Sequence, residues 1–329
     1  MKMVIMAFRF GFGSLVTCAV LLLTGCGQDP APGAAEGPDR VTIVAAAYPF
    51  QFVAERVAGS RGQVTPLTQP GTEPHDLELT PRQVASVIDA DLVVYEKTFQ
   101  AAVDDAVAQS ERDNALDTTT AVPLENLGTE TDHEHAEGEE HAGAEEHAGA
   151  EEDAGSGLDP HVWLDPAHLA TIGAAVAERL SAVDPDHAAD YAANAEALES
   201  DLTTLGQEYD TALGSCERTE FITTHAAFGY LAKRYGLTQI GISGLSPDAE
   251  PSPARIAEVQ AEARQHGITT IFYETLVSPD VARSLATDIG LRTDVLDPVE
   301  GITPESRGTD YLSVMRSNLT ALTTANGCR

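Results

Sequence analysis

The sequence predicts an α/β protein with two lobes, each built on a mainly parallel β-sheet flanked by helices. Residues 26–329 remain after an apparent export signal, and these roughly 300 residues suffice for two lobes of about 100 to 150 residues each. Short apolar segments alternate with capped helical segments, a rhythm typical of parallel strands joined by crossover helices. An amphipathic segment between the two halves is long enough to run along both of them as a helical spine.

The chain begins with the layout of an export signal in residues 1–25. Two basic residues precede the apolar run Leu15–Leu23, and this segment should not enter the fold. Its end, Leu23-Thr24-Gly25-Cys26, resembles a bacterial lipobox, so we expect Cys26 to carry lipid and to begin the mature chain. The alternative is an ordinary signal peptide with an incidental cysteine. Residues 26–40 are rich in glycine, proline, alanine and acid, which predicts a flexible tether.

We expect residues 41–164 to form the N-terminal lobe. Thr80 and Pro81 predict a helix start, with threonine as the N-cap, proline in the first turn and Gln83 at the capping-box position. The other elements predicted here are strands over Val41–Ala47, Val64–Leu67 and Asp91–Tyr95 and a helix over Phe52–Ala58.

A low-complexity insert interrupts this lobe over residues 130–157. From Glu130 to Asp153 the composition changes to histidine, acid, alanine and glycine, with 11 acidic residues and no basic ones. Such a composition cannot form a core, so we expect the insert to be disordered. Its histidines are His133, His135, His141 and His147.

Two helices are predicted to link the lobes over residues 165–215. Asp165 and Pro166 provide a cap and a first-turn proline, and Asp184-Pro185 separates the first helix from the second. The apolar residues recur at three- and four-residue steps, which keeps one face of each helix apolar. They are Leu169, Ile172, Val176 and Leu180 in the first helix and Tyr191, Leu198, Leu202, Leu205, Tyr209 and Leu213 in the second.

Residues 216–329 repeat the α/β rhythm, and we expect them to form the C-terminal lobe. Ser252-Pro253 and Ser278-Pro279 each open a helix, and these helices should end near Gly267 and Gly290. The other predicted elements are strands over Glu220–Thr223, Gln239–Ile242, Ile271–Tyr273 and Asp294–Leu296 and helices over Phe228–Tyr235 and Asp310–Leu322.

The charge and the cysteines limit the partners and the compartment. The formal net charge is −33, which excludes nucleic acid as a partner because phosphate binding depends on lysine and arginine. No apolar run beyond the N-terminus approaches the roughly 20 residues of a membrane helix, so we expect a chain that is soluble after processing or tethered at one end. In an oxidising compartment, Cys216 and Cys328 should form a bridge rather than remain as two buried thiols.

Three histidines outside the insert, His75, His161 and His225, are predicted at junctions between a strand and a helix, where parallel sheets place their ligands. Glu300 is a fourth candidate, on the segment Leu296–Gly301. Taken singly, each histidine is better explained as a capping or hydrogen-bonding residue. The separations along the chain match no short zinc motif, so spacing alone establishes no site.

Longer motifs surround all four residues. They are GTEPHDLELTP from Gly71, DPHVWLDP from Asp159, THAAFGYL from Thr224 and DPVEG from Asp297. These segments resemble the zinc-binding solute-binding lipoproteins of ABC metal importers, the ZnuA/AdcA type of the cluster A-I periplasmic-binding-protein family. The resemblance runs from about Val41 to the end of the chain, and its two most specific segments are those of His75 and His161.

The resemblance implies two lobes joined by a spine helix, with a metal site in the cleft between them. His75 and His161 from the first lobe, His225 from the second lobe and Glu300 are the implied ligands. Three imidazoles and one carboxylate make a tetrahedral set that suits Zn²⁺, whereas Mn²⁺ would be better served by more oxygen ligands. A manganese carrier of this architecture is expected to replace His225 by a carboxylate.

Further carboxylates are candidates to contact these ligands or to replace one of them. Asp297 is a substitute ligand for Glu300 or a neighbour of the ligands. Asp76, Glu78 and Glu274 are candidates to hydrogen-bond the ring nitrogen of His75 that faces away from the metal. Solvated acids or helix caps are the alternative reading of each.

The implied function is capture of Zn²⁺, as the transported ligand, and its delivery to an ABC-type permease, without enzymatic activity. We expect a monomer, lipid-anchored through Cys26 at the outer face of the cytoplasmic membrane, in the periplasm or at the cell surface. Closure of the lobes or ordering of the ligand loops would signal the loaded state. The insert histidines are hypothesised to capture Zn²⁺ weakly, and the alternative is an acidic loop with incidental histidines.

Other functions stay open at this point. A carrier of Mn²⁺ or of another divalent metal would share the architecture. A zinc hydrolase would need an open metal position, and the sequence has no His-Glu-x-x-His helix. A surface adhesin is a third option, for which the sequence identifies no host ligand.

Overall fold

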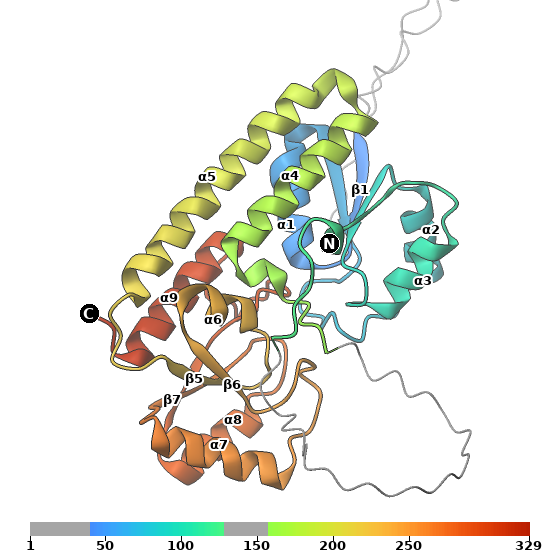
Figure 1. Cartoon of the computed structure of the whole chain (residues 1–329). Helices are drawn as coiled ribbons and strands as arrows, with labels where there is room; N and C mark the ends of the chain where they lie inside the picture. Colours follow the sequence, from blue (N-terminus) through green and yellow to red (C-terminus); the bar gives the residue numbers. More distant parts are fainter. Residues whose placement is uncertain (1–39, 128–156) are drawn as a thin grey trace, which may run out of the picture. The chain divides into compact units, whose positions relative to one another are not determined.

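A computed structural model describes residues 40–127 and 157–329, all of which belong to one compact unit, Asp39–Arg329 (Figure 1). The predicted signal, Cys26, the tether up to residue 39 and the four insert histidines lie outside the described residues. The fold class is confirmed: two parallel sheets, each flanked by helices, are joined by a pair of long helices.

The first sheet has the strand order β2-β1-β3-β4, and all of its strands are parallel. Its central strand pairs in the register Val41↔Gly62 on one side and Ile43↔Leu92 on the other. The elements are β1 (Val41–Ala45), α1 (Tyr48–Ala58), β2 (Gly62–Pro66), α2 (Pro81–Asp89), β3 (Leu92–Tyr95), α3 (Ala101–Gln109) and β4 (Ala115–Asp117).

The second sheet repeats this topology in the order β6-β5-β7-β8, again with parallel strands. Its elements are β5 (Glu220–Thr223), α6 (Gly229–Tyr235), β6 (Thr238–Gly241), α7 (Pro253–Gln265), β7 (Thr270–Tyr273), α8 (Asp280–Ile289), β8 (Arg292–Val295) and α9 (Tyr311–Asn326). In both sheets the first strand lies between the second and the third, so the loops at its carboxyl end mark the switch point where open α/β sheets bind ligands.

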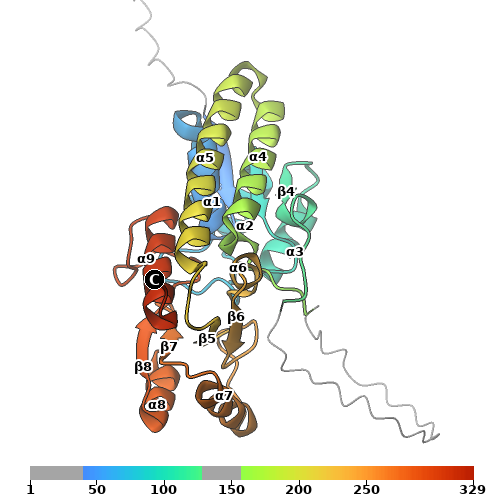
Figure 2. The ribbon, with the colours of Figure 1, turned by 60° about the vertical axis from the view of Figure 1, so that its left-hand side comes forward.

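The two linking helices are α4 (Pro166–Val183) and α5 (Ala188–Leu213), which lie side by side in both views (Figures 1 and 2). Every apolar residue predicted for their inner faces is buried. The α5 helix packs against α1 and α4 at one end and against α6 and α9 at the other. It therefore runs along both halves, as predicted for a spine.

The apolar core does not divide where the lobes divide. One cluster of buried side chains continues from the first sheet through α4 and α5 to α6 and α9. A second, smaller cluster lies under α7 and α8 on the other face of the second sheet. The larger cluster crosses the boundaries predicted at residues 164 and 215, so the core does not show where one lobe ends and the next begins. Those boundaries stay a prediction.

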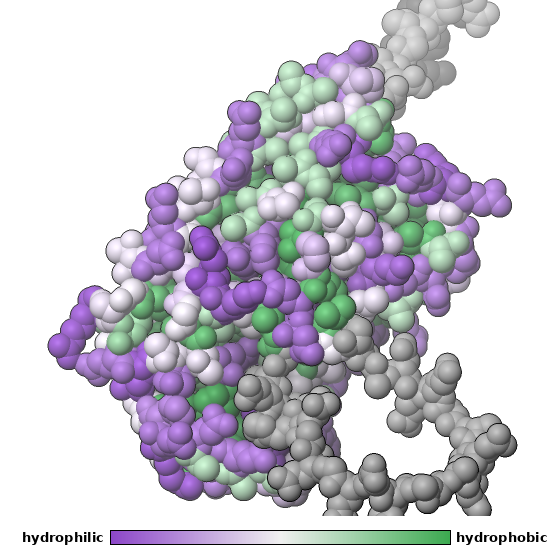
Figure 3. All heavy atoms as spheres, viewed as in Figure 1, coloured by the Kyte–Doolittle hydropathy of each residue, from purple (hydrophilic) through white to green (hydrophobic). Residues whose placement is uncertain are grey.

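A disulfide joins Cys216, just after α5, to Cys328, just after α9. It confirms the predicted bridge and excludes the alternative of two buried thiols. Within residues 40–127 and 157–329, no helix is long and apolar enough to cross a membrane. On the face shown in Figure 3, hydrophilic residues lie between small apolar patches.

Several local expectations need correction. The helix predicted to open at Ser278-Pro279 begins one residue later, at Asp280, because Pro279 is its N-cap and Ser278 Oγ accepts a hydrogen bond from the Asp280 N–H. The closing helix continues past Leu322 to Asn326. The elements α3 and β4 were not predicted.

Candidate metal centre

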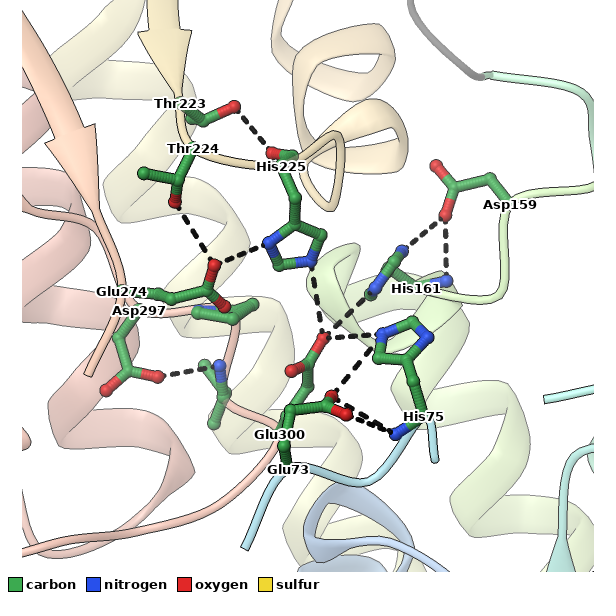
Figure 4. Close-up of polar contacts among 12 residues, drawn as sticks. Glu73, His75, Asp159, His161, Thr223, Thr224, His225, Glu274, Asp297 and Glu300 are labelled. Carbon is green, nitrogen blue, oxygen red and sulfur yellow. Dashed lines mark hydrogen bonds and ion pairs between the residues drawn. The ribbon is translucent and has the colours of Figure 1, made fainter. Parts of the chain in front are cut away.

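Four side chains that lie far apart in the sequence converge at one point, at which each offers a donor atom within 4.8 Å of the others (Figure 4). They are His75, His161, His225 and Glu300, the four predicted residues. His75 lies between β2 and α2, His225 follows β5, and Glu300 follows β8. These loops all lie at the carboxyl ends of strands, as the parallel sheets require.

His161 departs from the expected setting. The described residues directly before it, 157–160, contain no strand and form only an isolated antiparallel bridge, between Asp159 and Glu125. His161 is the N-cap of a short 3-10 helix, Val162–Leu164, which leads into α4. The prediction that this histidine follows a strand was therefore wrong, although it lies in the cluster.

The three imidazoles surround one carboxylate oxygen. Oε1 of Glu300 lies 3.4 Å from Nε2 of His75, 3.1 Å from Nε2 of His161 and 3.6 Å from Nε2 of His225. Ligands bound tetrahedrally at about 2.0 to 2.1 Å from Zn²⁺ stand about 3.3 Å apart. The three oxygen–nitrogen separations lie close to that edge length, and all four donor atoms lie within 4.8 Å of one another, so small side-chain movements would accommodate the ion.

The site is enclosed on nearly every side. The side chains of His161 and Glu300 are fully buried, that of His225 is almost fully buried, and His75 is 13% exposed. A cavity of about 470 Å³ opens beside His75 and is also lined by Phe99, Pro160 and Leu245. An ion that enters from solvent would therefore meet His75 first.

Two buried carboxylates hold the outer nitrogens of the buried imidazoles. Nδ1 of His161 lies 2.8 Å from Oδ1 of Asp159, which also accepts a hydrogen bond from the His161 backbone N–H. Nδ1 of His225 lies 2.7 Å from Oε1 of Glu274. Each neutral ring that donates from Nδ1 has an unprotonated Nε2 directed at the centre, which is the state that binds a metal.

His75 is held differently from its two neighbours. The carboxylate of Glu73 accepts the backbone N–H of His75 at 3.0 and 3.1 Å, and Glu73 Oε1 lies 4.0 Å from Nε2. The ring of Phe99 packs edge-on at 4.9 Å between centroids. Glu274, predicted to hydrogen-bond His75, contacts His225 instead, because β7 lies next to β5 in the sheet. Asp76 and Glu78, the other candidates for His75, are exposed.

Asp297 lies outside the group of four donors and fixes the loop that carries Glu300. Its Oδ1 accepts the N–H of Val299 at 2.8 Å, and its Oδ2 accepts from Thr275 Oγ1 and Ser306 Oγ at 3.1 Å each. Burial raises the pKa of Asp297 to about 6, against the lowering effect of these hydrogen bonds. Asp297 was predicted either to replace Glu300 as a ligand or to lie beside the ligands, and these contacts favour the second role.

The carboxylates and imidazoles of the cluster shift one another's pKa values in opposite directions. Burial lowers the pKa of His225, but Glu274 and Glu300 outweigh it, so that the pKa lies well above the usual value of 6.5. Burial likewise lowers the pKa of His161, and Asp159 and Glu300 raise it by more. Burial raises the pKa of Glu300, yet the three histidines around it bring that pKa well below 4.5. Protons therefore compete with a cation for the imidazole nitrogens.

Sequence reasoning missed three contributors to this centre: Glu73, Asp159 and Trp163. For Asp159 a signal was present, because an aspartate two residues before a histidine can accept its backbone N–H. The indole Nε1 of Trp163 donates to the carbonyl of Pro298, 135 residues away in the chain, and no local pattern predicts such a bond.

Comparison with known proteins gives a consistent result. The sequence profile of a family described as "Zinc-uptake complex component A periplasmic" matches residues 43–325. The "High-affinity zinc uptake system protein ZnuA" of Bacillus subtilis is 34% identical over 313 residues, which cover 94% of this chain and 95% of that protein. The "Zinc-binding lipoprotein AdcA" of Streptococcus pneumoniae is 36% identical over 311 residues, 93% of this chain but only 58% of that longer protein.

Solved structures agree with the fold. The Zn(II)-bound ZnuA-like domain of Streptococcus pneumoniae AdcA superposes with a TM-score of 0.70 at 34% identity, covering 87% of this chain and 99% of that domain. The laminin-binding protein Lmb of Streptococcus agalactiae, described as having adhesin and metal-transporting activity, gives a TM-score of 0.73 at 29% identity. That match also covers 87% of this chain and 99% of the other.

Proposed function

The chain belongs to the family of periplasmic zinc-uptake components, and we propose that it captures Zn²⁺ outside the cytoplasm and delivers it to an ABC-type permease. Zn²⁺ is the cargo, held by His75, His161, His225 and Glu300. One observation carries the proposal: three imidazole nitrogens face a single buried carboxylate oxygen at 3.1 to 3.6 Å. No other group of donors in the described residues combines histidine with a carboxylate in this way.

The composition of the donor set favours zinc over manganese. Imidazole nitrogen is a good ligand for Zn²⁺, whereas Mn²⁺ prefers an environment dominated by oxygen. The other carboxylates near the centre, Asp159 and Glu274, are each engaged with the Nδ1 of a histidine. Neither is a member of the group of four donors, which therefore offers manganese a single carboxylate.

The same geometry favours binding over catalysis. Catalytic zinc sites combine three protein ligands with one open position for water. Here Glu300 supplies a fourth protein donor and is fully buried. A closed set of four ligands suits a protein that carries the ion without acting on another molecule.

The site of action follows from the leader and the family. We propose that the chain is exported and held at the membrane surface by lipid on Cys26, since the segment Leu23–Cys26 resembles a lipobox. The insert histidines are proposed to raise the local zinc concentration. The described chain stops at Leu127 and resumes at Gly157. Gly157 lies close to Asp159 and His161 in sequence, and the bridge between Glu125 and Asp159 brings the Leu127 side close as well.

Metal analysis of the purified mature chain tests the proposal. After competition between Zn²⁺ and Mn²⁺ at equal concentrations, we expect about one zinc ion tightly held per chain. His225→Ala should lose most of that zinc because it removes a buried ligand. His266→Ala is the matched control, since His266 pairs with Glu220 at the surface. Preferential retention of manganese, or equal zinc content in the His225→Ala variant, would contradict the proposal.

A further inference from the structure

Trp163 connects the segments that carry the metal donors. It is the only tryptophan of the chain, and it is completely buried in the short 3-10 helix that follows His161. Its ring lies 5.3 Å from that of His161 and 5.4 Å from that of Phe99, centroid to centroid. Phe99 in turn packs edge-on against His75. One aromatic side chain thus supports two of the three imidazoles.

The polar groups of Trp163 reach the C-terminal part of the chain. Its indole N–H donates to the carbonyl oxygen of Pro298 at 2.8 Å, and its own carbonyl accepts from the hydroxyl of Tyr311 at 2.6 Å. Pro298 stands two residues before Glu300, just as His161 stands two residues before Trp163. The indole bond therefore joins the backbone that presents the carboxylate to the backbone that presents an imidazole.

The loop that receives this bond is held in a strained conformation. Val299 has a φ of 59°, in the left-handed region that a β-branched residue rarely adopts, and its side chain is fully buried. Such a conformation persists only where the surroundings impose it. Two hydrogen bonds do so: the N–H of Val299 donates to Asp297, and the preceding carbonyl, that of Pro298, accepts from Trp163.

We propose that Trp163 is a positioning residue of the metal centre, whose indole N–H holds the strained Pro298–Val299 peptide so that Glu300 faces the three imidazoles before the ion arrives. This inference rests on the proposed function and adds to it a residue that touches no metal. If the N–H is removed, Val299 can relax toward negative φ, which turns the carboxylate of Glu300 away from its place.

Two variants remove the N–H with different effects on packing. Trp163→Phe keeps an aromatic ring but reduces the buried volume. The analogue benzothienylalanine, in which sulfur replaces the indole N–H, keeps the volume, and biosynthetic incorporation changes position 163 alone because the chain has a single tryptophan. We expect both variants to bind Zn²⁺ about 10- to 100-fold more weakly in competition with a chelator, the usual effect of losing an outer hydrogen bond.

Two readouts separate positioning from general stability. The absorption spectrum of the Co²⁺-loaded variants should shift toward that of Glu300→Ala, because the carboxylate is displaced from the ion. In a double-mutant cycle, Trp163→Phe should cost less than about 2-fold once Glu300 is already alanine, since its effect passes through that residue. Tyr209→Phe is the matched control, because it removes another buried hydrogen bond from an aromatic side chain to a backbone carbonyl, that from the Tyr209 hydroxyl to Met315. It should change stability and leave both readouts unaltered.

Three results would overturn the inference. They are wild-type zinc affinity in both variants, an unchanged Co²⁺ spectrum, and an equal loss of affinity in the Glu300→Ala background. A wild-type chain that binds no Zn²⁺ would instead refute the proposed function itself. The two failures are thus distinguishable within one set of measurements.

Discussion

At the scale of single residues, the buried imidazoles depend on the carboxylates behind them. His161 has Asp159 on its outer nitrogen, and His225 has Glu274. In each carboxylate one oxygen faces the ring, and the other is buried without a protein partner in the described part of the chain. His75 is partly exposed and has no such partner at hydrogen-bond distance among the described residues, which makes it the ligand most free to move.

Glu274→Ala should therefore lower zinc affinity by about 10- to 100-fold, because the His225 ring loses the acceptor that fixes its orientation and tautomer. Glu274→Gln should retain most of the affinity, since its amide oxygen can still accept the Nδ1–H. Chelator competition measures both variants. The control is Glu220→Ala, which removes the carboxylate next to the surface residue His266. Equal affinity of the Glu274→Ala and wild-type chains would show that Glu274 does not orient the ligand.

Zinc binding should release protons at neutral pH. The carboxylates around His161 and His225 raise the pKa values of both rings, so protons compete with the ion for their nitrogens. Apparent affinity should consequently rise with pH through the neutral range. Titration calorimetry at about pH 7 in buffers of different ionisation enthalpy measures the number released. Identical heats in all buffers would mean that His161 and His225 hold no proton for the ion to displace.

The same groups make the stability of the chain without bound metal depend on pH. A raised histidine pKa adds stability below the ordinary value of 6.5, and this is lost as the pH rises through the raised value. The lowered pKa of Glu300 adds stability above 4.5, which is lost as the pH falls. The cluster therefore contributes most to stability between about pH 4.5 and pH 6.5. The rise in melting temperature caused by Zn²⁺ should be larger at about pH 8 than at about pH 5.5, where protons compete with the ion.

At the scale of helices and strands, local signals predicted most of the fold. The capping box at Thr80, the cap at Asp165 and the glycine stop at Gly290 are all present in the structure. These succeed because a cap satisfies backbone groups within four residues of itself. The α3 and β4 elements lack such signals: no side chain caps α3, and β4 has only three residues.

The candidate site was only partly predictable. The histidines were found through motifs that resemble a family, because the distances between them along the chain depend on how two sheets fold together. Which carboxylate serves which ring depends on strand neighbours: Glu274 meets His225 because β7 pairs with β5. The bond from Trp163 to Pro298 likewise follows from the docking of one half on the other. Sequence periodicity contains none of this information.

Gly229 shows how closely α6 docks on the segment of His161. A Cβ added at this first residue of the helix would lie 2.4 Å from Oδ2 of Asp159 and 2.7 Å from Cβ of Leu127. Gly229→Ala should therefore cost about 1 to 3 kcal/mol of stability, despite the better helix propensity of alanine. It should also weaken zinc binding, because Asp159 must move from His161.

Gly244→Ala is the matched control for that substitution, since a Cβ there would meet nothing within 4 Å. Urea unfolding and chelator competition measure the two effects. If Gly229→Ala were as stable and as tight a binder as Gly244→Ala, the contact between α6 and the Asp159 segment would be looser than described.

At the scale of the whole molecule, the two sheets are held together by shared structure. The larger apolar cluster continues through both halves, and α5 packs against helices of each. Cross-connections such as the bond from Tyr209 to Met315 tie this helix to α9. Such an arrangement favours small movements of the ligand loops over a wide opening between the sheets.

The disulfide acts on this assembly from outside the metal centre. Cys216 and Cys328 are 112 residues apart in sequence. Joining them lowers the entropy of the unfolded chain, which raises the free energy of unfolding by about 4 to 5 kcal/mol in the chain-entropy treatment. The Cys216→Ser and Cys328→Ser double variant should therefore unfold at markedly lower urea concentration. Its zinc affinity should stay within about 2-fold of wild type, because the folded site depends on the hydrogen bonds around His161, His225 and Glu300, none of which involves either cysteine. A large loss of affinity in the folded double variant would mean that the bridge also fixes the metal centre, through α9 and the Asn318 side chain that bonds both backbone groups of Asp297.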